Sequence, residues 1–127
     1  MHLRNAVVKL FLPLGLLAIA FAATGKSQPD AIKGYVLDSA CAFTKNLQRP
    51  ISPACAVACA KAGSPLVILS EDGTIYWPIA DATPASGQND KLLPFAGQKV
   101  TATGKVFERG GSRALVIDKI VPVSNSK

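Results

Sequence analysis

Apolar and polar residues alternate along five short segments of the chain. The alternation is clearest in Gln98–Glu108, where Val100, Ala102, Gly104 and Val106 fall on one face. Because successive side chains of a strand point to opposite faces, this pattern predicts a half-buried β-strand. The same reasoning predicts four further strands, at Ile32–Asp38, Pro65–Ser70, Thr74–Ile79 and Ser112–Val121.

Turn residues pair these strands. Asp72 and Gly73 separate the second strand from the third, and a Gly110–Gly111 pair separates the fourth from the fifth. Both are typical of tight β-hairpins, because glycine adopts the positive φ that such turns need. Between the third and fourth strands, Ala80–Lys91 has no periodicity and predicts a long surface loop.

One helix is predicted, and it follows the first strand. Ser52 is a suitable N-cap, Pro53 suits the first helical position, an alanine-rich stretch follows, and Gly63 provides the stop. The segment Ser39–Ile51, between the first strand and this helix, is expected to be irregular.

The expected fold class is mainly β, a small closed or nearly closed barrel of five strands with one short helix inserted after the first strand. The strand segments resemble those of bacterial OB-fold domains at Gly34–Asp38, Leu66–Leu69, Gly97–Val106 and Leu115–Ile120. In an OB barrel, the loop after strand one and the loop between strands four and five flank the binding face. The resemblance therefore places the cysteine-containing segment beside that face.

A second resemblance lies in the spacing of cysteine, glycine and proline. The motif is Asp38-x-x-Cys41, then Cys55-Ala-x-x-Cys59-Ala-x-x-Gly63-x-Pro65, then Asp72-Gly73-x-x-Tyr76. It is similar to a family of small secreted bacterial proteins to which no activity is assigned. The resemblance thus implies a family and a location but no reaction.

The first residues have the composition of an export signal. Arg4 and Lys9 precede a short apolar stretch, and Ala20 and Ala22 fit the rule for signal peptidase cleavage. We expect a signal peptide at 1–22, a flexible leader at 23–31, the barrel at 32–122 and a polar tail at 123–127, with an uncleaved anchor as the alternative. The protein is then periplasmic or secreted, and the mature chain contains no membrane span.

Charge and composition narrow the classes of function. Removing 22 of the 127 residues leaves one domain, with 12 of the 14 basic residues against 8 acidic ones. The positive charges form no run, so there is no strong signal for a nucleic acid partner. The only histidine, His2, lies in the signal, which excludes histidine-dependent hydrolases and histidine-ligated metals in the mature protein. We therefore expect no enzyme.

The chemistry that remains rests on Cys41, Cys55 and Cys59, an odd number for an exported protein. The first interpretation is a structural disulfide from Cys41 to the helix, with one thiol left over. The second is a thiolate site for Cu(I) or Zn(II), formed by the three cysteines with Asp38 as a fourth ligand. The third is thiol redox chemistry at Cys55, in the first turn of the helix, where the helix dipole favours a thiolate.

Two aromatic residues, Tyr76 and Trp77, are a further candidate binding surface, because OB domains stack ligands on aromatic side chains. Core packing is the alternative for residues of this type in so small a barrel. Taken together, the sequence predicts a small exported binding or accessory module whose ligand is not specified, with soft-metal binding and thiol redox activity as alternatives.

Overall fold

The structure is a computed structural model that describes residues 30–45 and 52–124. Its elements in chain order are β1 (Asp30–Asp38), α1 (Ser39–Thr44), α2 (Pro53–Lys61), β2 (Leu66–Ser70), β3 (Ile75–Pro78), α3 (Asn89–Leu92), the 3-10 helix η1 (Leu93–Phe95), β4 (Lys99–Arg109) and β5 (Ser112–Pro122). The predicted signal peptide at 1–22 and the leader up to residue 29 lie outside the described residues. None of the helices within the described ranges is long and apolar enough to cross a membrane.

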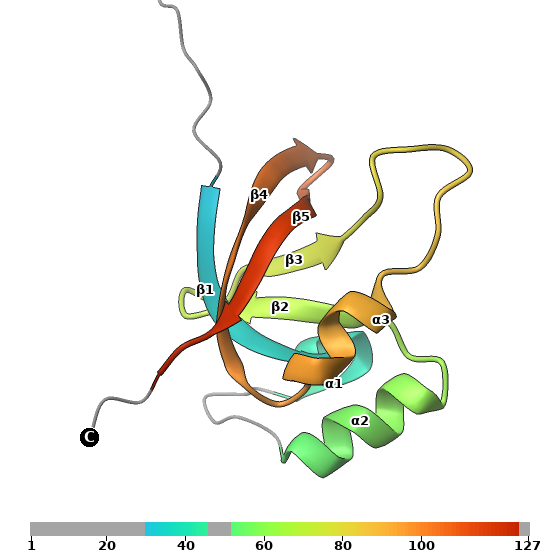
Figure 1. Cartoon of the computed structure of the whole chain (residues 1–127), viewed down its shortest axis with the longest axis vertical. Coiled ribbons are helices and arrows are strands. Elements are labelled where there is room, and N and C mark those ends of the chain that lie inside the picture. The colour runs from blue at the N-terminus through green and yellow to red at the C-terminus, as the bar shows by residue number, and fades with distance from the viewer. Residues whose placement is uncertain (1–29, 46–51, 125–127) are drawn as a thin grey trace, which may run out of the picture.

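The five strands close into a barrel in the order β1-β2-β3-β5-β4 (Figure 1). All neighbouring pairs are antiparallel except β3 and β5, which run parallel, with Trp77 opposite Ala114. The prediction of a small, five-stranded, mainly β barrel is confirmed. The two predicted hairpin turns are present as well, because Gly73, Gly110 and Gly111 have positive φ at the β2–β3 and β4–β5 connections.

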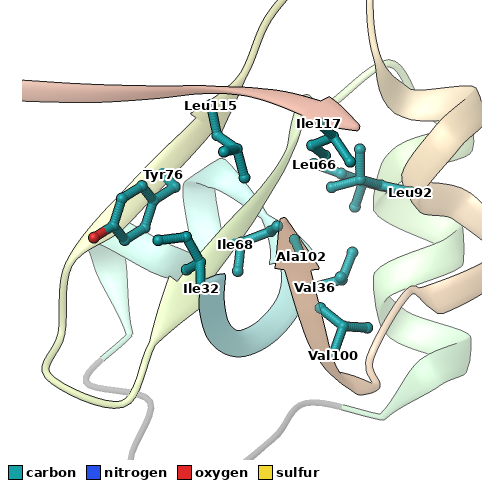
Figure 2. Packing of buried hydrophobic residues seen from close by; sticks show 10 residues of the cluster. All are labelled: Ile32, Val36, Leu66, Ile68, Tyr76, Leu92, Val100, Ala102, Leu115 and Ile117. Carbon is teal, nitrogen blue, oxygen red and sulfur yellow. The ribbon is translucent and has the colours of Figure 1, made fainter. Parts of the chain in front are cut away.

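Side chains from every strand fill the barrel (Figure 2). The face predicted for the fourth strand is the inner one: Val100 and Ala102 are fully buried, and Val106 packs at the edge of the core. The complete cluster consists of Ile32, Val36, Leu66, Ile68, Tyr76, Leu92, Val100, Ala102, Leu115 and Ile117. Burial of these apolar side chains is the main stabilising contribution in a domain of this size.

Two short helices lie where the sequence predicted none. The Ser39–Ile51 segment was expected to be irregular, but α1 begins directly after β1, because Asp38 caps it by accepting a hydrogen bond from the Cys41 N–H at 3.1 Å. The expected surface loop ends in α3, whose Leu92 points into the barrel and is fully buried (Figure 2). These helices are too short to show helical periodicity; the Asp38 cap holds α1 in place, and the burial of Leu92 holds α3.

The predicted helix is present as α2. The Ser52 hydroxyl accepts a hydrogen bond from the Cys55 N–H at 3.1 Å, Pro53 occupies the first turn, and Gly63 ends the helix region with φ 97°. Figure 1 shows α1, α2 and α3 gathered at one end of the barrel, away from the β4–β5 hairpin turn. This arrangement brings the ends of β1, α2 and the β3–β4 connection together.

Candidate functional site

Asp38 is the centre of a polar and thiol cluster at the end of β1. Its side chain is 1% exposed, and Oδ2 accepts hydrogen bonds from the Cys41 N–H at 3.1 Å and from the Ser64 hydroxyl at 3.2 Å. The Ser64 N–H in turn donates to the Cys59 carbonyl at 3.1 Å, which joins α2 to this place. Oδ1 is buried and has no well-aligned hydrogen-bond donor among the described residues. We call Asp38, Cys41, Cys59 and Ser64 the Asp38 cluster.

The backbone around the cluster is held by hydrogen bonds between segments distant in sequence. The Ser39 N–H donates to the Pro65 carbonyl at 2.8 Å, which joins the start of α1 to the start of β2. The Asn89 side chain accepts from the Leu66 N–H at 2.8 Å and donates to the Ser64 carbonyl at 2.9 Å. Asn89 therefore fastens α3 to the segment that carries Ser64.

The three cysteines differ in accessibility. Cys41 is the buried residue of α1, Cys59 is half-buried on α2, and Cys55 is exposed one helical turn before Cys59. Cys55 and Cys59 are four residues apart on α2 and therefore lie on the same face of this helix. The cluster is thus layered, with Cys55 outside, Cys59 between, and Cys41 with Asp38 inside.

Each ionisable group in the Asp38 cluster affects the others. Hydrogen bonding to Asp38, burial and the charge of Asp38 together raise the pKa of the Cys41 thiol from 9.0 to about 11. Desolvation and the nearby Asp38 carboxylate raise the pKa of Cys59 as well. Burial raises the pKa of Asp38, but hydrogen bonds from Cys41, Ser64 and Cys59 outweigh burial, so this pKa is below its usual value. At neutral pH the cluster is a buried carboxylate beside two protonated thiols.

The described residues contain no group of three or more histidine, cysteine, aspartate or glutamate side chains arranged to hold a metal ion. The predicted thiolate metal site of Cys41, Cys55, Cys59 and Asp38 therefore stays a prediction. The cysteines are free thiols in the structure, so the predicted disulfide from Cys41 to the helix is not observed. The interpretation of thiol redox chemistry at Cys55 stays a prediction.

A groove of about 460 Å³ opens on another face of the barrel, between α1, β3 and the β4–β5 hairpin. Two of its walls are the rings of Phe43 and Trp77, with centroids 6.1 Å apart and planes tilted by 33°. The charged residues in its lining are Glu108 and Arg113, which form an ion pair at 3.2 Å. The rest of the lining is Gly73, Thr74, Ile75, Gly111 and Ser112.

The structure separates the two predicted surface aromatics. Trp77 lines the groove, whereas Tyr76 is 8% exposed and belongs to the barrel core. Their opposite placements follow from the strand, because neighbouring residues of β3 point to opposite faces. The Tyr76 hydroxyl still reaches the rim of the barrel, where Arg113 donates a hydrogen bond to it at 3.4 Å.

The segment after β1 that was predicted to contain the cysteine site contributes residues both to the Asp38 cluster and to the groove. Cys41 is buried and its N–H donates to Asp38, while Phe43, two residues later on α1, is 67% exposed and lines the groove. Sequence reasoning missed Phe43, Ser64, Asn89 and Arg113. Phe43 is a lone aromatic residue in a segment expected to be irregular, and nothing else in the sequence marked it. The roles of Ser64, Asn89 and Arg113 depend on contacts between segments distant in sequence.

No protein-family model, curated protein or solved structure matches the chain. The functional argument therefore rests on the geometry of the groove and of the Asp38 cluster.

Proposed function

We propose that this protein is an exported binding module that takes a sugar ring of a saccharide in the groove between Phe43 and Trp77. The observation that carries the proposal is this aromatic pair, which lines an open groove bounded by the segment after β1 and by the β4–β5 hairpin. These two connections flank the binding face of OB-like barrels. A volume of about 460 Å³ is also within the usual range for small-ligand sites.

The chemistry of the lining favours a neutral, ring-shaped ligand. Aromatic faces pack against the apolar C–H face of a sugar, while Thr74, Ser112, Glu108 and Arg113 offer hydrogen-bond donors and acceptors to its hydroxyl groups. Glu108 and Arg113 pair with each other, so the groove has little net charge. A single-stranded nucleic acid would need a track of unpaired basic residues for its phosphates. The groove contains only one arginine among its described lining residues, and that arginine is paired.

Trp77 makes the proposal directly testable, because it is the only tryptophan of the chain. Its fluorescence reports on the groove without labelling. We expect a saturable change in intensity or wavelength when the protein is titrated with members of a panel of neutral oligosaccharides. An oligonucleotide of mixed sequence, added over the same concentration range, should produce no saturable change.

Two matched variants locate the binding. Phe43→Ala should abolish the saccharide response by removing one wall of the groove. Phe107→Ala should leave it unchanged, because Phe107 is exposed beside Lys105 and does not line the groove. The proposal is wrong if only the oligonucleotide binds, if no saccharide in the panel does, or if Phe43→Ala binds as tightly as the unchanged protein.

A further inference from the structure

Glu108 and Arg113 lie opposite each other on β4 and β5, close to the turn of the hairpin. They are register partners on the two strands, and both line the groove. The Arg113 Nε and Glu108 Oε2 atoms are 3.2 Å apart, and both side chains stay accessible, Arg113 to 39% and Glu108 to 62%. The pair therefore presents a hydrogen-bond donor and an acceptor side by side to a ligand in the groove.

A second contact, from the barrel core, fixes the guanidinium group of Arg113. Its Nη1 atom donates to the hydroxyl of Tyr76 at 3.4 Å, and Tyr76 is a core residue that is 8% exposed. An arginine carries five N–H donors in one plane. Nε and Nη1 are engaged by Glu108 and Tyr76, whereas Nη2 has no acceptor within residues 30–45 and 52–124. The guanidinium group is thus held in one orientation and retains donors for a ligand.

We propose that Glu108 and Arg113 together recognise two adjacent hydroxyl groups of the sugar ring, one at each partner. This inference rests on the proposed saccharide function and names the part of the sugar that the groove selects. A guanidinium group only donates hydrogen bonds and a carboxylate only accepts them, whereas a hydroxyl group does both. One hydroxyl group therefore accepts from Arg113 while its neighbour donates to Glu108. Oxygen atoms on adjacent ring carbons are close enough together to reach two protein groups that are themselves in contact.

The aromatic side chains and the ion pair then have different tasks in the groove. The rings of Phe43 and Trp77 pack against the apolar face of a sugar, which many sugars share. A site that hydrogen-bonds a particular hydroxyl group rejects an analogue without it, because the protein groups lose their partner. Glu108 also disfavours an acidic sugar, since it repels a second carboxylate placed beside it. The ion pair is therefore the element of the groove that determines specificity.

The test uses the purified protein, its Trp77 fluorescence and methyl pyranosides of glucose, mannose and galactose. Each glycoside is compared with derivatives that lack the hydroxyl group on the second, third, fourth or sixth ring-numbered carbon. The third carbon belongs to every pair of adjacent free hydroxyl groups in these glycosides. Loss of its hydroxyl group, and of the one on either the second or the fourth carbon, should weaken binding about tenfold or more, because hydrogen bonds to charged groups are strong. Loss of the hydroxyl group on the sixth carbon should change binding by no more than about threefold.

Three variants assign this preference to the ion pair. Arg113→Lys keeps the charge but loses the planar set of donors, and Glu108→Gln keeps the shape but loses the charge. Each should bind the best glycoside about tenfold more weakly and discriminate little against its derivative that lacks the hydroxyl group on the third carbon. Tyr76→Phe, which frees Arg113 from its second contact, should also reduce this discrimination. Glu71→Gln is the matched control, because Glu71 pairs with Lys99 outside the lining of the groove, and it should change neither affinity nor preference.

Failure of this inference can be told apart from failure of the saccharide proposal. The inference is wrong, although the groove still binds sugars, if the required hydroxyl groups are not adjacent or if Arg113→Lys and Glu108→Gln keep the preference of the unchanged protein. It is also wrong if methyl glucuronide binds more tightly than the neutral glycosides, or if oligosaccharides bind but no methyl glycoside does. If no saccharide binds at all, both proposals are wrong. Circular dichroism establishes that each variant is folded, and Glu108→Gln, at an exposed position, decides the outcome if Arg113→Lys is not.

Discussion

Gly104 of β4 lies directly against the backbone of Val116 on β5. A Cβ atom placed on Gly104 would come within 1.9 Å of the Val116 carbonyl oxygen. The contact occurs at a bulge, where Thr103 is opposite Lys119 and Gly104 opposite Ile117, so that Asp118 has no partner of its own. An extra residue on one strand bends it toward its neighbour, and the resulting close approach leaves room only for glycine.

Gly104→Val should therefore destabilise the barrel by about 1 to 3 kcal/mol, through overpacking and displacement of β5. Chemical unfolding followed by Trp77 fluorescence measures the change in the free energy of unfolding. Gly87→Val is the matched control, because Gly87 is exposed and its Cβ would meet no atom within 4 Å. Equal stability of the two variants would contradict the close packing at the bulge.

The strands could be predicted from the sequence because their signals are local. Period-two alternation in Gln98–Glu108 gave the correct inner face, and glycines with positive φ marked both hairpin turns. The parallel pairing of β3 with β5 has no such local signal. It joins residues 37 positions apart in the chain, so it depends on the path of the whole β3–β4 connection and of β4.

Asn89 should be the residue that holds this connection in place. Asn89→Ala removes the partners of the Leu66 N–H and the Ser64 carbonyl, and a buried polar group left without a partner costs about 1 to 3 kcal/mol. Lys91→Ala, in the same short helix but exposed, should cost far less. Unfolding curves of the two variants measure how much the free energy of unfolding decreases in each. Similar decreases would show that the hydrogen bonds of Asn89 contribute little to stability.

The sites were less predictable than the fold, because their residues meet only in three dimensions. Asp38 and Cys41 are local neighbours, joined by a helix cap, and the sequence placed them together. Ser64 and Arg113 lie far from their partners in sequence, and their residue types are common on surfaces. The sequence also named Tyr76 and Trp77 as one surface, although adjacent strand residues must point to opposite faces.

Ser52 should determine the order of the first turn of α2, and with it the positions of Cys55 and Cys59. Its hydroxyl accepts the Cys55 N–H, and loss of such a cap typically costs about 1 kcal/mol. Hydrogen exchange measured by mass spectrometry should show faster exchange in α2 for Ser52→Ala. Ser52→Asp, which restores an acceptor and adds a negative charge at the helix N-terminus, should retain slow exchange. Equal exchange in both variants would mean that tertiary contacts alone order this turn.

Alkaline pH should weaken the fold through Cys41. The pKa of this thiol is raised from 9.0 to about 11 in the folded chain, because Asp38 and burial disfavour the thiolate. A group whose pKa is higher in the folded state stabilises the fold fully below its unfolded pKa, and this contribution disappears as the pH rises through the folded pKa. The free energy of unfolding should thus decrease between about pH 9 and pH 11.

Lysine and tyrosine residues titrate over the same range, so the prediction concerns the difference between variants. Cys41→Ala should be less stable than the unchanged protein at pH 8, because it leaves a cavity where the buried sulfur was. The difference in the free energy of unfolding between the two proteins should decrease from pH 9 to pH 11, since the variant has no thiol at position 41 to deprotonate. Cys55→Ala, which removes an exposed thiol, is the control for replacing a cysteine outside the buried position. If this difference stayed constant up to pH 11, the result would contradict the effect of Asp38 on Cys41, because the buried carboxylate raises the pKa of this thiol and keeps it protonated.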